Sequence, residues 1–441
     1  MSAEGRAASG RMEGQGFYTE HSEAQRGYVE LGLEWLGRAA GEVEPPPDGP
    51  PFVVADMGAA GGGNSLAPMR RALAARRGDG PALVVHTDIP SNDFSALFEL
   101  VGTSPDSYAD APEVFTLAAG RSFYERLLPE RFLSVGWSSI AVHWLSAVPA
   151  PIPDHIYCSF ATGAVRDALR AQSGADWLAF LRGRARELRP SGRLVVLGGA
   201  AQDDGRSGAE GLMDMANGAL GQLVEAGALT PAEHERMTIP TWNRTEAEFV
   251  APFEAGELDG ELTLLRHELR WLPDGYFEAY AADGDLDAYT GAVAGFFRAA
   301  FEQSLWAALD SGRSEADRAA LAASFHERLR AAIVADPERA ACRWLWCCST
   351  SCGRAAETPD GAGGREPFAP ARRRSAQRRR GDVSVGRSTR ATRRPSARTT
   401  TRTRSRARRP ASLRATALGS ATLIAARPPA LTRRGASTRT R

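Results

Sequence analysis

The sequence predicts an α/β fold built on a mostly parallel sheet that helices cover on both faces. Short apolar runs recur along the first half of the chain, and a helical or loop segment follows each of them. These runs occupy residues 52–56, 82–87, 114–117, 132–136 and 193–197. Apolar residues at helical spacing occupy residues 22–39, 65–77, 95–101 and 176–188. Strands that alternate with helices form parallel sheets, because each crossover helix returns the chain to the same edge.

A mainly helical block interrupts this pattern from about residue 205 to residue 334. Its apolar residues recur at helical spacing over 212–229, 288–309 and 319–334. Residues 262–272 alternate apolar and polar side chains, which predicts a strand that returns to the sheet. A helical block inserted before the sheet is complete predicts a cap over the ends of the strands.

Length and composition indicate a globular protein with a separate tail. The chain has 441 residues, of which 43% are apolar, enough for at least one large core. The net charge of +1 hides an asymmetry, because residues 342–441 hold 25 Arg against four acids and residues 1–341 carry an excess of 20 negative charges. We predict a disordered arm at 1–16, a folded domain at 17–341 with the cap at about 205–334, and a disordered tail at 342–441.

The start of the chain gives no sign of export. Residues 1–16 are polar and rich in Gly, and no run approaches about eighteen apolar residues. The sequence therefore predicts a soluble cytoplasmic protein without a membrane span. Cysteine usage agrees, because Cys158 is the only cysteine before residue 342, which excludes a disulfide framework there.

The segment VVADMGAAGGGN, residues 53–64, is the strongest single motif. An apolar strand ends at Asp56, Gly58 and the later glycines let the turn approach a ligand closely, and Asn64 opens a helix. Dinucleotide enzymes and S-adenosylmethionine enzymes both use such a turn. The Asp56 carboxylate suits the cationic methionyl part of S-adenosylmethionine and repels a pyrophosphate. The motif favours a methyltransferase without excluding a dinucleotide enzyme.

A second acidic residue, Asp88, follows the second apolar run in VVHTDIPSNDF. A carboxylate at this strand end holds ribose hydroxyls in doubly wound folds. The alternative is that Asp88 and Asp93 cap the turns around Pro90 and the helix behind it. Asp88 on its own leaves the two interpretations open.

Several blocks, in one order along the chain, resemble the SABATH family of carboxyl methyltransferases, which act on salicylate, benzoate, jasmonate, indole-acetate and xanthine in plants. FYTEHSEAQ is similar to the family's S-Y-A-x-N-S-x-x-Q, ADMGAAGGGNSL to its A-D-L-G-C-S-S-G-P-N-T, and HTDIPSNDFSALF to its N-D-L-P-x-N-D-F-N-x-L-F. GRSFYERLLPERFLSVGWSSIAVHWLSAVP and MTIPTW match later blocks. The resemblance implies a Rossmann-like class I methyltransferase sheet with a mainly helical cap.

The resemblance also implies the cofactor and its binding residues. The cofactor is S-adenosylmethionine, with Asp88 on its ribose and Ser122 and Phe123 beside its adenine. The full set implied for cofactor binding is Ser22, Asp56, Gly58, Asn64, Asp88, Ile89, Ser122 and Phe123.

The acceptor implied by the resemblance is the carboxylate of a small-molecule acid, which becomes a methyl ester. Gln25 and Trp144 would orient the carboxylate with N–H donors. His143, Met213 and Trp242 would line the acceptor pocket, although His143 alone also fits an ordinary core histidine. Trp242 and Phe249 fit either this cavity or plain core.

The chain departs from the family pattern at positions that shape the pocket. His21 replaces the family's Asn, Ile140 stands where many relatives have Tyr, and Met213 takes roughly the place of a pocket Trp. An aliphatic or less planar acid therefore suits the pocket at least as well as salicylate. Members of the family are commonly dimeric, so a homodimer is an expectation as well.

No catalytic acid or base is predicted, because a carboxylic acid with a pKa of about 4 is already ionised near pH 7. Orientation and desolvation would then supply the acceleration. The alternatives are methylation of a ring nitrogen or a phenol on the same scaffold, and a non-catalytic relative whose Arg-rich tail binds nucleic acid.

The tail is the part of the chain that fits the family least. Relatives end in a strand after the last helix, but here periodicity is lost from about Cys347, so we expect a frameshifted gene end and a sheet that lacks this strand. All basic residues are Arg, which with the Ala and Gly excess indicates high-GC coding more than nucleic-acid binding. The spacing C-x4-C-C-x3-C lacks the paired C-x2-C arms of zinc sites, so no metal is predicted.

Overall fold

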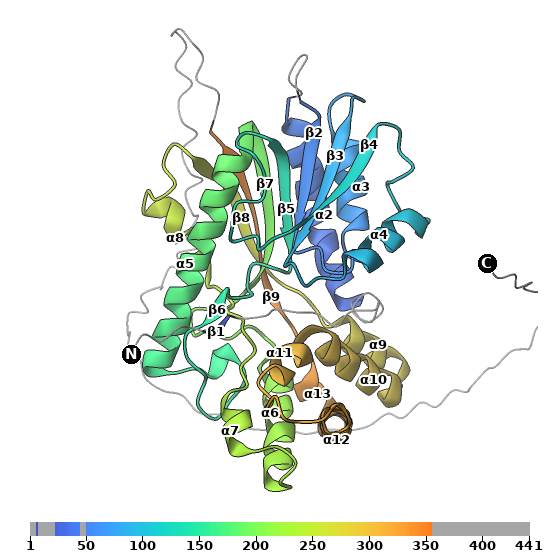
Figure 1. The fold of residues 1–441 in the computed structure, drawn as a ribbon, viewed down its shortest axis with the longest axis vertical. Coiled ribbons are helices and arrows are strands. Elements are labelled where there is room, and N and C mark those ends of the chain that lie inside the picture. The colour runs from blue at the N-terminus through green and yellow to red at the C-terminus, as the bar shows by residue number, and fades with distance from the viewer. Residues whose placement is uncertain (1–5, 8–22, 45–49, 355–441) are drawn as a thin grey trace, which may run out of the picture. The chain divides into compact units, whose positions relative to one another are not determined.

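The computed structural model describes residues 6–7, 23–44 and 50–354. It confirms the predicted α/β fold, with a seven-stranded sheet in the order β4-β3-β2-β5-β7-β9-β8 (Figure 1). The strands are β2 (Phe52–Met57), β3 (Ala82–Asp88), β4 (Val114–Gly120), β5 (Leu133–Ser139), β7 (Leu188–Ala200), β8 (Leu262–Trp271) and β9 (Leu345–Gly353). The predicted disordered arm, apart from residues 6–7, and the tail beyond residue 354 lie outside the described residues.

The strands from β4 to β7 run parallel and contain all the apolar runs found in the sequence. Helices α2 (Glu23–Glu42), α3 (Leu66–Ala75) and α4 (Phe94–Thr103) cover one face, and α5 (Gly163–Glu187) and α8 (Glu246–Glu254) cover the other. Successive strand residues alternate between these two layers, so that Val54 and Val135 pack on one side and Val53 and Val85 on the other. Burial on both faces explains why the inner strands are nearly continuous apolar runs, whereas the edge strand β4 leaves Phe115 and Leu117 exposed.

The expectation that the sheet lacks its terminal strand is wrong. The strand β9 lies between β7 and β8 and pairs antiparallel with both, from Arg193↔Cys352 to Ala200↔Leu345 on the β7 side. The returning strand predicted at 262–272 is its other neighbour. Small Cys, Ser and Thr side chains fit this two-sided position, where both neighbours satisfy the backbone. The folded domain therefore reaches Gly353, beyond the predicted boundary at residue 341.

The helical block forms the predicted cap, which gathers at one end of the sheet in Figure 1. Its elements are α6 (Glu210–Glu225), α7 (Pro231–Glu235), α9 (Gly275–Asp283), α10 (Leu286–Phe297), the π-helix η2 (Arg298–Glu302), α11 (Gln303–Trp306), α12 (Glu315–Ala335) and α13 (Pro337–Ala340). One apolar core joins Met213, Phe297 and Phe325 of the cap to Leu197 and Trp346 of the sheet. The cap and the sheet are thus packed as one body.

Two short elements complete the described fold. The strand β6 (Ala147–Val148) pairs antiparallel with β1 (Arg6–Ala7), and a 3-10 helix, η1, spans Cys158–Phe160. None of the described helices has the length and apolar character that crossing a membrane requires.

Candidate functional site

The loops that follow β2 and β3 are bonded to each other at the carboxyl edge of the sheet. The backbone N–H groups of Gly58 and Ala59 donate to the Thr87 carbonyl at 2.9 and 3.0 Å. The Asn92 amide donates to the Ala60 carbonyl at 2.9 Å, and the Ala60 N–H donates to Asp88 Oδ2 at 2.8 Å. The loop after β3 therefore fixes the position of the glycine-rich turn at the carboxyl ends of the strands.

Gly58 occupies a position that only glycine fits. Its φ is +93°, and a Cβ there would lie 2.5 Å from the Ala141 Cβ and 3.7 Å from the Phe123 ring. The loops after β4 and β5 thus approach the same turn. The carboxyl ends of the four neighbouring strands β4, β3, β2 and β5 therefore meet here.

The Asp56 carboxylate is 4% exposed and lies between β3 and the start of α3. The Ser65 hydroxyl donates to its Oδ2, and His86 Nδ1 lies 3.7 Å from the same oxygen. In the described part of the chain Oδ1 has no hydrogen-bond partner. One oxygen is thus fixed by the protein and the other is free to accept a hydrogen bond.

Of the two interpretations that the sequence left open, the structure shows the capping role for Asp93, and the ribose role of Asp88 stays a prediction. Asp93 caps α4, because its side chain accepts from the Ala96 N–H at 3.0 Å. Asp88 instead accepts from Ala60 N–H and, at 2.8 Å, from Ile89 N–H. Burial raises the pKa of Asp88 from its ordinary 3.8 to about 6.

The acceptor motif SSIAVHWLSAVP lies directly against the MTIPTW segment of the cap. The backbone N–H of Trp242 donates to the His143 carbonyl, and the backbone N–H of Leu145 donates to the Pro240 carbonyl, both at 2.8 Å. Trp144 and Thr241 form an antiparallel bridge between them. Two motifs about one hundred residues apart thus lie side by side, and we call this paired region the acceptor wall, after the role predicted for it.

His143 and Trp144 present unpaired polar atoms in this wall. His143 is 9% exposed and its Nδ1 has no hydrogen-bond partner among the described residues. Burial, with a smaller contribution from the Arg244 charge, lowers the pKa of His143 to about 3, so the imidazole is neutral at pH 7. The Trp144 ring lies 6.2 Å from the Phe301 ring, and its indole N–H makes no hydrogen bond within the described chain.

Comparison with known proteins identifies the family of the chain. The family model described as SAM-dependent carboxyl methyltransferase matches residues 7–327. This chain belongs to that family.

Individual relatives agree with this assignment. The O-methyltransferase acrG of Aspergillus aculeatus is 33% identical over 266 residues, which cover 56% of this chain and 68% of that protein. Indole-3-acetate O-methyltransferase 1 of Oryza sativa subsp. japonica is 31% identical over 294 residues, which cover 58% and 72%. The structure of loganic acid methyltransferase with SAH superposes with a TM-score of 0.61 at 21% identity over 78% of this chain and 99% of that one, which supports the fold.

The chain is therefore an S-adenosylmethionine-dependent carboxyl methyltransferase, and its residues can be tested against that cofactor. Asn64 Oδ1 is buried and has no hydrogen-bond partner in the described residues. A buried acceptor without a donor is costly, so a polar ligand is the natural partner for Asn64. Together with the open turn at Gly58 and the free oxygen of Asp56, this environment fits a nucleoside that carries a charged amino acid.

The methyltransferase holds Ser122 and Phe123 in the loop after β4. The Ser122 hydroxyl accepts from the Tyr124 N–H at 3.3 Å. Phe123 packs edge-on against Tyr124 and Phe180, and Arg184 donates to its carbonyl at 2.8 Å. Phe123 is thus fixed beside the turn at Gly58, whereas its predicted contact with adenine stays a prediction.

The remaining residues predicted for the methyltransferase site divide into three groups. Met213 is fully buried on α6 in the same core as Trp144, and Trp242 donates from its indole N–H to Glu248 Oε2 at 3.0 Å. Phe249 packs on Trp177 beneath the sheet, so it is core. Gln25 lies in the first turn of α2, and Ser22 and His21 lie outside the described residues; the contacts predicted for Ser22 and Gln25 stay predictions.

Sequence reasoning missed two side chains beside the acceptor wall. Phe301 reaches Trp144 from the π-helix η2, an irregularity that often occurs at functional sites. Tyr124 donates from its hydroxyl to the Trp144 carbonyl at 2.5 Å. Both contacts join distant parts of the chain. The only signal in the sequence is that Tyr124 falls inside the GRSFYERLLPERF block.

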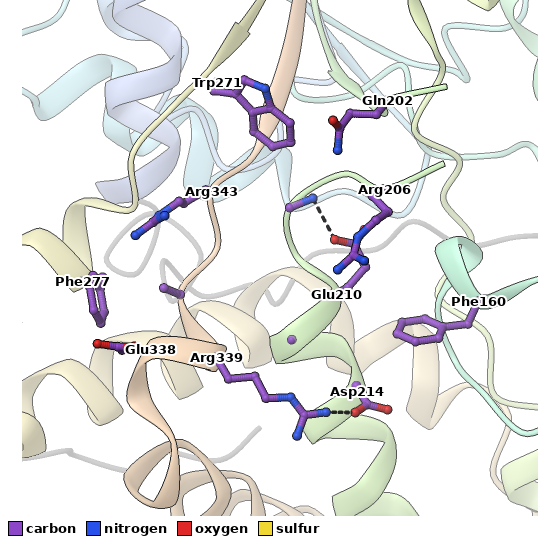
Figure 2. Close-up of a pocket in the computed structure, with 13 residues that line it drawn as sticks. Phe160, Gln202, Arg206, Glu210, Asp214, Trp271, Phe277, Glu338, Arg339 and Arg343 are labelled. Atoms are coloured by element: carbon purple, nitrogen blue, oxygen red, sulfur yellow. Dashed lines mark hydrogen bonds and ion pairs between the residues drawn. The ribbon is translucent and has the colours of Figure 1, made fainter. Parts of the chain in front are cut away.

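A large groove of about 760 Å³ lies elsewhere in the methyltransferase, between the ends of β7 and β8 and the start of α6 (Figure 2). None of the site residues predicted from sequence lines it. Arg339 is paired with Asp214, and the Glu210 carboxylate accepts from Ser207 and Gly208 N–H at 2.6 and 2.9 Å. Its acids are thus largely engaged within the protein. No described group of three or more His, Cys, Asp or Glu side chains is arranged to hold a metal ion.

Proposed function

We propose that this enzyme forms methyl esters of a small-molecule acid whose carboxylate lies beside His143 and Trp144. The observation that carries the proposal is that His143 Nδ1 is buried without a hydrogen-bond partner among the described residues, beside Trp144, whose described hydrogen bonds are all made by its backbone. The two polar atoms concerned are His143 Nδ1 and the Trp144 indole N–H. Both belong to uncharged side chains and both are nearly buried. Uncharged donors orient an anion without stabilising its charge strongly, which suits a reaction that consumes this charge.

The proposed mechanism needs no proton transfer. An acid with a pKa of about 4 arrives ionised at neutral pH, and the neutral His143 neither adds nor removes a proton. S-adenosylmethionine, when bound, supplies the electrophilic methyl group on its sulfonium. The protein holds one carboxylate oxygen in line with this methyl group and excludes water, so that orientation and desolvation provide the acceleration.

The cofactor side of the proposal uses the residues that converge at the carboxyl edge. Asp56 Oδ1 would accept from the methionyl amino group, and Asp88 would accept from the ribose. The rest of the cofactor site would be formed by Asn64, Gly58, Ile89, Ser122 and Phe123, and Ser22 would close it. The support is that Gly58, Asp88 and Phe123 already touch or bond to one another's loops.

The acceptor side is proposed to be aliphatic and aromatic in character. Gln25 would share the carboxylate with Trp144, while Met213 and Trp242 would contribute apolar wall. Ile140, which has a φ of +59°, packs against both the cap core and the α2 core. An aliphatic side chain here leaves room for an acid that is not planar.

Two measurements test this function. Calorimetry with S-adenosylmethionine checks cofactor binding, and transfer of a labelled methyl group to aromatic, terpenoid and fatty acids, followed by mass spectrometry, checks the product. We expect a methyl ester of at least one acid. Cofactor binding with exclusive methylation of a phenol or ring nitrogen would overturn the proposal, and absence of both binding and transfer would indicate a non-catalytic relative.

Cytoplasmic location and a homodimer are also part of the proposal. The five cysteines are all free in the structure, which fits a reducing compartment. Fractionation of cells that express the tagged full chain tests the location. Light scattering of the purified protein tests the dimer.

A further inference from the structure

His86 is a fully buried histidine of β3 that lies beside the Asp56 carboxylate. The parallel register of β2 and β3 pairs Asp56 with His86, so the two side chains leave the same face of the sheet. The distance from His86 Nδ1 to Asp56 Oδ2 is 3.7 Å. Nδ1 has no hydrogen-bond partner among the described residues. One edge of the ring therefore faces the acid that is predicted to hold the cofactor.

The other edge of the ring is fixed by Tyr108, from the loop between α4 and β4. His86 Nε2 and the Tyr108 hydroxyl lie 2.6 Å apart, and the Thr116 hydroxyl donates to the same Tyr108 oxygen at 3.5 Å. Burial, with a smaller contribution from the Asp56 charge, raises the pKa of Tyr108 to about 12, so the phenol keeps its proton at neutral pH. Because Tyr108 accepts from Thr116, its own proton is available to His86 Nε2.

These contacts assign the tautomer of His86. A neutral imidazole carries one ring proton, so a ring that accepts from Tyr108 at Nε2 holds its proton on Nδ1. The opposite tautomer would direct the Nδ1 lone pair at a buried carboxylate, which is electrostatically unfavourable. The Nδ1–H group therefore points towards Asp56 Oδ2, at a distance longer than a hydrogen bond, and acts on it as a dipole.

The Asp56 carboxylate keeps its negative charge in this environment. The Ser65 hydroxyl donates to Oδ2, the oxygen that His86 also faces, and Oδ1 has no hydrogen-bond partner in the described chain. Both neighbours of Oδ2 are uncharged donors, so they orient the carboxylate without neutralising it. A buried carboxylate with an unpaired oxygen favours a cationic ligand, because a buried charge without a partner is costly.

We propose that neutral His86 is a positioning residue that holds the Asp56 carboxylate in the orientation that accepts the methionyl ammonium group of the cofactor. The Nδ1–H dipole and the Ser65 hydroxyl hold Oδ2, and Oδ1 is left for the ammonium group. Tyr108 acts one step further away, because it keeps the proton of His86 on Nδ1. This inference rests on the proposed function, which takes Asp56 as the residue that binds the methionyl amino group.

Two variants of His86 separate the Nδ1 donor from the rest of the ring. Asparagine places its amide nitrogen close to the position of Nδ1, whereas phenylalanine keeps the shape of a ring without a donor. We expect His86→Phe to raise the Kd for S-adenosylmethionine about fivefold, and His86→Asn to stay within about twofold of the unmodified enzyme. Tyr108→Phe removes the hydroxyl that fixes the tautomer and should raise the same Kd by a smaller factor.

The binding of methylthioadenosine distinguishes positioning from general damage to the site. This nucleoside keeps the adenine, the ribose and the sulfur of the cofactor but lacks the amino acid part, so it has no ammonium group for Asp56. Calorimetry should show that His86→Phe leaves the Kd for methylthioadenosine unchanged. Equal weakening of both ligands, or equal losses of S-adenosylmethionine affinity in the Phe and Asn variants, would overturn the inference.

His155 provides the matched control. It is also a buried histidine, and its Nδ1 accepts from the Tyr157 N–H at 3.0 Å, but its ring is stacked on Phe160 at 3.7 Å between ring centroids and does not face Asp56. His155→Phe should lower thermal stability without changing the Kd for either ligand. A fivefold loss of S-adenosylmethionine affinity alone in this variant would also overturn the inference, because the effect would not depend on contact with Asp56.

A measurement on the unmodified enzyme keeps the inference testable if His86→Phe does not fold. NMR of the enzyme with nitrogen-labelled histidine distinguishes the two ring nitrogens, and His86 should carry its proton on Nδ1 alone. A proton on Nε2, alone or together with one on Nδ1, would overturn the inference.

The variant Asp56→Asn separates failure of this inference from failure of the proposed function. If Asp56→Asn binds S-adenosylmethionine as tightly as the unmodified enzyme, Asp56 does not hold the ammonium group and both the inference and the proposed cofactor site fail. If Asp56→Asn binds weakly while His86→Phe binds normally, the inference alone fails.

Discussion

The backbone N–H of Ala60 donates to Asp88 Oδ2 at 2.8 Å, which ties the glycine-rich turn after β2 to the end of β3. The same carboxylate accepts from Ile89, so its two oxygens hold two loops at once. Its burial raises its pKa to about 6, close to the pH of ordinary assays. The Asp88 side chain therefore determines both the geometry of the two loops and the charge at the predicted ribose site.

This coupling predicts a pH dependence of cofactor binding. Below about pH 6 Asp88 takes up a proton and loses strength as an acceptor, so affinity for S-adenosylmethionine should fall as pH decreases from 7 to 5. Because the folded pKa lies above the ordinary value of 3.8, protonation of Asp88 should also raise the stability of the cofactor-free protein as the pH falls from about 6 to about 4. Calorimetry across this range checks the affinity. Asp88→Asn should bind weakly at all pH values, and an unchanged pH profile in this variant would exclude Asp88 as the cause.

Substitution of Asn64 should weaken cofactor binding without lowering the free energy of unfolding. Its Oδ1 is buried without a partner in the described residues, so Asn64→Ala removes an unsatisfied acceptor from the cofactor-free protein. We expect the free energy of unfolding to change by less than about 0.5 kcal/mol or to increase. The Kd for S-adenosylmethionine should rise about tenfold. Urea unfolding and calorimetry on the same preparation measure the two quantities, and a large loss of stability with unchanged Kd would contradict the assignment.

Substitution of Gly58 by alanine should strongly destabilise the fold. Gly58→Ala combines a φ of +93° with a Cβ 2.5 Å from that of Ala141, so we expect a loss of about 2 to 4 kcal/mol in the free energy of unfolding. Gly78 is the matched control, because its φ is +76° and a Cβ at this position would have no neighbouring atom within 4 Å. Gly78→Ala should cost only about 1 kcal/mol. Equal losses in the two variants would show that the contact with Ala141 is unimportant.

Trp144 and Gln25 test the acceptor side. Trp144→Phe removes the indole N–H and keeps most of the contact with Phe301, so kcat/KM for the acid should fall about tenfold while the cofactor Kd stays constant. Gln25→Ala should lower turnover of the same acid, because the carboxylate loses its second predicted donor. Full turnover in Gln25→Ala would count heavily against the carboxylate role.

The sequence was sufficient to predict the parallel half of the sheet and its ligand-binding edge. Buried strands such as Phe52–Met57 are apolar apart from Asp56, and Gly58 marks a turn that other residues adopt only with strain. The sequence blocks that resemble the SABATH family then indicated the candidate cofactor and acceptor residues. These signals are local, so they can be read directly along the chain.

Other features could not be predicted because they depend on contacts between distant segments. After Leu345 and Trp346, the strand β9 is made of small polar and sulfur-containing residues, and its pairing with β7 and β8 makes it a strand. The pairing of Trp144 with Thr241, and the burial of Arg244 behind Val142, likewise join segments about one hundred residues apart. Helix α5 begins at Gly163, well before the apolar spacing predicted a helix, because its first turns are largely exposed.

The position of β9 determines where the chain can be shortened without loss of the fold. The strand β9 is the inner strand between β7 and β8, so a chain that stops at residue 341 would leave both neighbours with unpaired edges and expose the apolar surface that Leu345 and Trp346 cover. We expect this chain to aggregate or remain unfolded. A chain that stops at residue 354 retains every described strand and should fold, bind S-adenosylmethionine and methylate the same acid as the full chain. Circular dichroism, thermal melting and the labelled-methyl assay compare the two truncations with the full chain. A folded and active chain ending at residue 341 would show that β9 is dispensable, and loss of activity in the chain ending at residue 354 would assign a function to the arginine-rich tail.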